Sequence, residues 1–187
     1  MSLYDLSPPP VEPVDLAEAK TWLRVDTTDE DALITALIMA ARHRIENYLR
    51  RSLINRAYIW RTCLPVDNFM CLPRPPLVSI TRLSLIGETD QAVDIPASDY
   101  EVITRREPGE LRLTTERNWT DYLSGFATLE VEFVAGYGTQ ATDVPTPIRQ
   151  ALRLLLGQYY EFREARPDAG LPDMVAALLA PYREIRL

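Results

Sequence analysis

Few side chains in this sequence could carry out chemistry, and their spacing matches no common catalytic or metal-binding motif. His43 is the single histidine. A triad would require a nucleophile and an orienting carboxylate near it, and no Gly-x-Ser-x-Gly turn is present. Cys63 and Cys71 are the only cysteines, and together with one histidine they provide too few ligands for a zinc site. We therefore expect no catalytic, cofactor-binding or metal-binding residues.

Two further patterns could bind ligands but are explained by local structure. Gly136-Tyr137-Gly138 follows a strand-like run, yet a phosphate loop needs more glycines, a Lys-Ser/Thr pair and an immediate helix. Asp29-Glu30-Asp31 stands at a predicted helix start, where negative charge complements the helix dipole. A hydrolase with paired carboxylates remains an alternative, because such pairs form in space and not along the sequence.

The charge balance argues against a protein that wraps nucleic acid. The chain has 20 Lys and Arg against 27 Asp and Glu, a net charge of −7. The net charge is −3 over residues 1–55, −5 over residues 56–143 and +1 over residues 144–187. Binding to phosphates requires a basic surface. The basic excess at the C-terminal end is better suited to a protein interface, where arginine is enriched.

Hydrophobic periodicity predicts helices at both ends of the chain. Asp15 is a candidate N-cap with Glu18 three residues later, the capping-box spacing. The apolar stripe of this first helix consists of Leu16, Ala19, Trp22 and Leu23. Apolar residues then recur every three or four positions over residues 33–48 and again over 148–162. A last short helix is predicted after Pro172.

The middle of the chain is typical of antiparallel β-structure. β-branched and aromatic runs between Ala57 and Val134 are separated by prolines and glycines. Residues 129–134 alternate apolar and acidic side chains, which predicts a half-buried strand. We therefore predict an α+β protein in which N-terminal and C-terminal helix pairs form a small helical bundle with an inserted antiparallel β-rich subdomain. The predicted boundaries are 14–55 and 144–187 for the bundle, 56–143 for the insertion and 1–13 for a proline-rich arm.

No segment suggests insertion into a membrane or secretion. The longest apolar runs are far shorter than the roughly 20 residues that span a bilayer. The N-terminal residues have neither the basic region nor the apolar region of a signal peptide. We expect the two thiols to be free, as is usual in a reducing cytoplasm.

Six segments in this order resemble one protein family. They are VDLAEAKTWLRVDTTDEDALITALIMAARHRIENYLRRSLI (14–54), LPRPPLVSI (72–80), SDYEV (98–102), VEFVAGYG (131–138), DVPTPIRQALRLLLGQYYEFREA (143–165) and LPDMVAALLAPYR (171–183). The set resembles the head–tail connector (adaptor) proteins of tailed bacteriophages, which also occur in prophages and gene transfer agents. The β-rich insertion makes this chain longer than the compact all-helical connectors.

The resemblance implies a structural protein without enzymatic activity. Such connectors form a ring of about a dozen copies beneath the portal, extend the DNA channel and dock a tail-side connector or stopper protein. The resemblance implies assembly in the bacterial host cytoplasm and then a place at the head–tail junction of the virion. The family contacts the portal largely through its C-terminal region. In this sequence that region contains Leu178, Leu179, Tyr182, Arg183 and Arg186.

Two alternatives remain open beside the connector: a DNA-packaging accessory that binds DNA directly, and an unrecognised hydrolase. An acidic channel protein has few phosphate anchors, so we expect DNA to pass through the ring without specific binding. Interfaces that bury little apolar area are often weak until a partner templates them. We therefore expect the isolated protein to be a monomer or a small oligomer.

Overall fold

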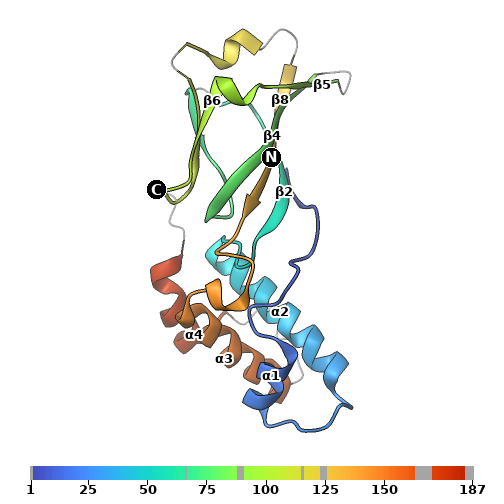
Figure 1. Ribbon diagram of the computed structural model, residues 1–187. Coiled ribbons are helices and arrows are strands. Elements are labelled where there is room, and N and C mark those ends of the chain that lie inside the picture. The colour runs from blue at the N-terminus through green and yellow to red at the C-terminus, as the bar shows by residue number, and fades with distance from the viewer. Residues whose placement is uncertain are drawn as a thin grey trace. The chain divides into compact units, whose positions relative to one another are not determined.

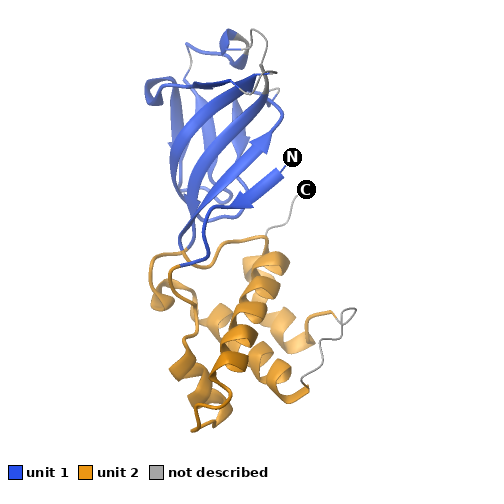
Figure 2. Cartoon of the chain, turned by 90° about the vertical axis from the view of Figure 1, so that its right-hand side faces the viewer, with its two compact units in different colours: residues 1–9, 55–136 blue, residues 10–54, 137–187 orange. Residues whose placement is uncertain are grey.

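The computed structural model describes residues 2–65, 67–87, 91–114, 116–122, 126–162 and 170–183. The protein is α+β, with α-helices and antiparallel sheets. It divides into two compact units, shown in different colours in Figure 2. The β unit comprises residues 1–9 and 55–136, and the helical unit comprises residues 10–54 and 137–187. Each unit therefore contains segments that are far apart in the sequence.

The helical unit contains four α-helices within the described residues (Figure 1). They are α1 (Leu16–Leu23), α2 (Asp31–Leu49), α3 (Thr146–Phe162) and α4 (Asp173–Leu179), accompanied by the short 3-10 turns η3 (Ala141–Asp143) and η4 (Ala180–Tyr182). One hydrophobic core contains buried residues from all four helices. Helix α2 contributes Ile34, Ile38, Ala41, Ile45 and Leu49, whose three- and four-residue spacing places them on one face.

Local capping explains where α1 begins and ends. Asp15 Oδ1 accepts a hydrogen bond from the Glu18 amide at 2.8 Å, so the predicted N-cap is confirmed. The carboxylate of Glu18 binds Arg149 and Arg153 on α3. These ion pairs connect α1 to α3. Helix α1 ends where Arg24 adopts the left-handed conformation (φ 59°, ψ 43°), which satisfies carbonyl groups of the last turn.

The β unit contains two antiparallel sheets (Figure 1). The first has the strand order β1-β2-β8-β4-β5, and the second has the order β3-β7-β6. The strands are β1 (Ser2–Asp5), β2 (Arg56–Thr62), β3 (Phe69–Cys71), β4 (Leu77–Gly87), β5 (Ala92–Asp94), β6 (Tyr100–Ile103), β7 (Glu110–Leu113) and β8 (Phe126–Ala135), with 3-10 turns η1 (Ala97–Asp99) and η2 (Trp119–Tyr122). Tyr58 on β2 is paired with Phe133 on β8, and their rings stack with centroids 5.3 Å apart.

Strand β8 is more deeply buried than its alternating sequence predicts. Leu129, Val131 and Phe133 are fully buried, as expected. Glu130, on the other face, is also only 5% exposed, because Arg61 of the neighbouring β2 donates to its carboxylate at 2.6 Å. A long side chain of the neighbouring strand therefore covers the Glu130 side chain on the outer face of β8.

The start of the chain is a strand, whereas the sequence predicts only a proline-rich arm over residues 1–13. Ser2–Asp5 form β1 and pair antiparallel with β2. The Asp5 carboxylate lies 3.5 Å from the Arg56 guanidinium. The pairing depends on an open strand edge that belongs to a distant part of the sequence, so local residue preferences do not reveal it. Among the described residues, no helix has both the length and the apolar character needed to cross a membrane.

Candidate functional site

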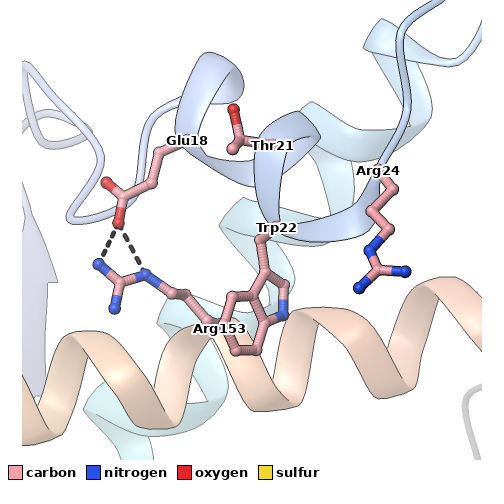
Figure 3. Close-up of a pocket in the computed structure, with 5 residues that line it drawn as sticks. All are labelled: Glu18, Thr21, Trp22, Arg24 and Arg153. Carbon is pink, nitrogen blue, oxygen red and sulfur yellow. Dashed lines mark hydrogen bonds and ion pairs between the residues drawn. The ribbon is translucent and has the colours of Figure 1, made fainter.

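A cavity of about 610 Å³ lies on the surface of the helical unit between α1 and α3. We call it the α1/α3 cavity. Glu18, Thr21, Trp22 and Arg24 line it from α1 and its C-cap, and Arg153 lines it from α3 (Figure 3). Residues 18, 21 and 22 are three and four positions apart, so they share one face of α1. The packing of this face of α1 against α3 therefore forms the cavity.

Charged side chains hold one wall of the cavity in place. The Glu18 carboxylate accepts hydrogen bonds from Arg149 Nη2 at 2.8 Å and from Arg153 Nε at 2.7 Å. Arg149 Nε also donates to the Pro13 carbonyl at 3.1 Å. Figure 3 shows the Arg153 guanidinium directed at Glu18. Two arginines and one carboxylate thus fix α1 against α3, and the cavity has a defined shape before any partner binds.

Trp22 is the unexpected residue of this cavity. Its place in the predicted apolar stripe suggests a core position, yet the side chain is 43% exposed. The indole reaches toward α3 (Figure 3), where a methyl group added at Gly157 would lie 3.5 Å from Trp22 Nε1. An exposed tryptophan beside the arginines Arg24 and Arg153 has the composition of a protein-binding hot spot. Helical periodicity predicts a buried Trp22. In the sequence, only the residue type, a tryptophan, indicates that this position could be a binding residue.

The predicted C-terminal surface is only partly exposed. Leu179 is fully buried in the core, because its spacing from buried Val175 directs both side chains inward. Leu178 and Tyr182 are half-buried and Arg183 is exposed, whereas Arg186 lies outside the described residues. The structure thus brings Leu178, Tyr182 and Arg183 to the surface near the end of the chain.

Two contacts fix the turn that follows α4. Arg51 Nε donates to the Tyr182 carbonyl at 2.5 Å. The Arg183 guanidinium lies 5.2 Å from the centre of the Tyr48 ring, within the range of a cation–π interaction. Both contacts connect the end of the described chain to α2 or to the residues directly after it.

The other residues considered in the sequence analysis belong to different units of the protein. His43 is exposed on α2, and the side chains of Cys63 and Cys71 are exposed in the β unit. Gly136 (φ 147°) leaves strand β8 in a turn, which agrees with the prediction for this glycine pair. Within the described ranges, no group of three His, Cys, Asp or Glu side chains is arranged to bind a metal ion.

The clearest pKa shifts lie in the β unit. Tyr122 donates to Asp99 Oδ2 at 2.6 Å. This hydrogen bond, with a second from Ser98, lowers the pKa of the Asp99 carboxyl. Burial and the same hydrogen bond raise the pKa of Tyr122 to about 12. Hydrogen bonds from Arg112 and Arg106 lower the pKa of Glu110. Each shift follows from burial or from hydrogen bonds within the β unit.

Comparisons with solved structures show a neck-protein fold. The chain is similar to one from the neck of an empty gene transfer agent particle, computed with C6 symmetry, with a TM-score of 0.81 and 24% identity. It is also similar to chains from the virion of a native gene transfer agent particle (TM-score 0.79, 24% identity) and from the neck of a native particle computed with C12 symmetry (0.79, 23%). Each match covers 100% of this chain and 97% of the other.

A family model matches 86 of the 187 residues of the chain. The model is that of the phage gp6-like head-tail connector proteins, and it matches residues 13–98. The resemblance to head–tail connector proteins that the sequence suggests is thereby confirmed. A comparison with curated protein sequences returned no significant match.

Proposed function

We propose that this protein is a structural head–tail connector of a tailed phage, a prophage or a gene transfer agent. In this proposal it forms a ring beneath the portal, extends the DNA channel and docks the tail. The observation that carries the proposal is the likeness to a particle-neck chain over the whole length of both, with a TM-score of 0.81. The connector family model over residues 13–98 supports it independently.

The architecture suits a building unit that acts in many copies. N-terminal and C-terminal helices share one core, which supports a bundle of helix pairs with an inserted β unit. A ring needs two unlike surfaces on each copy, because every copy binds its neighbours head to tail. The neck chains with the same fold come from particles computed with C6 and C12 symmetry, and this symmetry is compatible with such a ring.

We assign the portal contact to the C-terminal surface formed by Leu178, Tyr182 and Arg183, with Arg186 beyond the described residues. Arg183 is exposed, and its stacking on Tyr48 limits the conformations that it samples. The bond from Arg51 to the Tyr182 carbonyl pins the same turn. Preorganised side chains lose less entropy on binding, so this surface is prepared for a protein partner.

Reconstitution with the portal protein of the same particle tests the proposal. Electron microscopy of the mixture should show a ring of this protein on the portal, and particles that lack the protein should not retain tails. The Arg183→Ala variant should bind the portal more weakly, whereas Arg117→Ala, an exposed arginine of the β unit, should bind normally. A bare portal in the mixture, together with intact tails in the deletion, would contradict the proposal.

A gel-shift measurement separates the connector from the DNA-binding alternative, and light scattering tests the expected oligomeric state. With a net charge of −7, the protein should give no shift of a DNA fragment on a gel at low salt, whereas a DNA-packaging accessory would give a salt-sensitive shift. Light scattering should show a monomer or a small oligomer without the portal. A stable large ring in isolation would contradict the expected monomer or small oligomer but not the connector function.

A further inference from the structure

The first half of helix α2 presents an exposed face without charged residues. Residues 32–41 contain no Asp, Glu, Lys or Arg. The exposed positions in this stretch include two large apolar side chains, Leu33 (38% exposed) and Met39 (44% exposed). Three small exposed residues complete the face, which we call the α2 ridge: Ala32, Leu33, Ala36, Met39 and Ala40. Exposed helix faces of soluble proteins usually carry charge, so this face has the composition of a covered surface.

The α2 ridge and the α1/α3 cavity lie on different sides of the helical unit. Ile34, Ile38 and Ala41 of α2 are buried in the core that α1 and α3 share. The five ridge residues lie on the opposite side of α2 from these buried residues, so the ridge is turned away from those two helices. The helical unit therefore has two unlike apolar surfaces: a helix face rich in alanine, and a cavity that contains an exposed tryptophan.

We propose that the α2 ridge of one copy occupies the α1/α3 cavity of the next copy in the ring. This inference rests on the proposed connector function. A closed ring requires contact between two different surfaces of the same chain. Here one surface is a helix face and the other is a cavity that could receive it. Alanines at the centre of the ridge permit close approach of the helix backbone. Tryptophan and methionine are enriched, and charged residues depleted, at the centres of protein interfaces.

Charged residues beside the two surfaces also favour binding of the α2 ridge in the α1/α3 cavity of the neighbouring copy. Arg24 borders the cavity, and Asp29 precedes the ridge by three residues. Both are exposed. Within the part of the chain that the structure describes, neither forms an ion pair with another residue. When the ridge of one copy lies in the cavity of its neighbour, Asp29 can face the neighbour's Arg24. Rim charges of this kind set the orientation of the complex more than its affinity.

Disulfide cross-linking on the portal tests the contact directly. The exposed native thiols are first removed by Cys63→Ser and Cys71→Ser. Thr21→Cys in the cavity is then combined with Ala36→Cys on the ridge. Oxidation of the assembled ring should give a ladder of covalent multimers on a denaturing gel, because every interface links one copy to the next. Each single-cysteine variant is a control that should give no ladder, since its thiol faces no second cysteine across the interface.

A charged substitution provides a second, independent measurement. Ala36→Arg should leave the melting temperature of the isolated protein nearly unchanged, because arginine is a good helix former at an exposed position. It should abolish ring formation on the portal, whereas Ala36→Ser, which keeps the small volume, should assemble. Rings that form without a ladder and that tolerate Ala36→Arg would overturn this contact and leave the connector function intact. Absence of rings with the unmodified protein would overturn both.

Discussion

Arg42 of α2 is 2% exposed and donates from Nε to Glu12 Oε2 at 2.7 Å, across 30 residues of sequence. Its Nη1 donates to Glu46 Oε2 at 3.1 Å, and Glu46 Oε1 accepts from the Leu53 amide at 3.0 Å. One buried guanidinium thus connects the chain before α1, the body of α2 and the chain after α2. A buried charge is tolerated only with such partners, so this network helps to define the path of the chain in the helical unit.

The Glu12→Gln substitution should destabilise the helical unit. The neutral amide weakens a charge-assisted hydrogen bond to a buried arginine, and we expect the free energy of unfolding to fall by about 1–3 kcal/mol. Denaturant titration followed by far-UV circular dichroism measures the change. Glu161→Gln, an exposed position on α3, is the matched control and should change it by less than about 0.5 kcal/mol. Equal effects of the two substitutions would show that the Glu12 contact is not stabilising.

Buried and exposed apolar residues of α2 should separate stability from assembly. Ile45 is fully buried, and Ile45→Ala should lower the free energy of unfolding by about 2–5 kcal/mol through lost burial and a residual cavity. Leu33 belongs to the α2 ridge, so Leu33→Ala should leave unfolding nearly unchanged and should weaken ring assembly on the portal. Denaturant titration and electron microscopy of the two variants provide the measurements. A large loss of stability in Leu33→Ala would mean that this side chain belongs to the core.

Glu110 should make the β unit sensitive to acid. Hydrogen bonds from Arg112 and Arg106 hold the pKa of its carboxyl below the ordinary value of 4.5. Its contribution to stability is therefore complete above about pH 4.5 and is lost as the pH falls through the lower pKa of the folded protein. Glu110→Gln should be less stable than the unmodified protein at neutral pH, and the difference should shrink in acid. Thermal melts followed by tryptophan fluorescence at several pH values would reveal it; a constant difference would argue against the ionic contribution.

Tyr122 should titrate later than an ordinary tyrosine. Burial and its hydrogen bond to Asp99 raise its pKa to about 12. Asp99→Asn removes the negative charge but not the burial, so the pKa of Tyr122 should fall part of the way toward 10. NMR titration of protein labelled at the tyrosine ring carbons measures this, with Ser98→Ala as the control because Ser98 contacts Asp99 and not the phenol. An unchanged Tyr122 titration in Asp99→Asn would show that burial alone raises the pKa.

Particular residues show where sequence reasoning succeeded and where it could not. The N-cap at Asp15 and the buried apolar set of β8 follow from local patterns, and the structure has both. Helical spacing placed Trp22 in the core, yet its side chain is 43% exposed. Leu179 is buried, as its spacing from Val175 predicts, although the family resemblance placed it on the contact surface. Helical spacing identifies a stripe, but the packing partners decide which members of the stripe are covered. Glu130 is buried for the same reason, since Arg61 comes from a strand that is distant in sequence.

The sequence by itself determined the α+β composition, the order of helices and strands and the resemblance to head–tail connectors, because periodicity, capping residues and turn residues act over a few positions. Only the tertiary structure decided that Ser2–Asp5 complete a sheet, that Glu18 joins α1 to α3 and that a cavity with an exposed tryptophan lies between those helices. These features depend on which distant segments meet. Many pairings of amphipathic faces satisfy the same local pattern, and the packing of the whole core selects one of them.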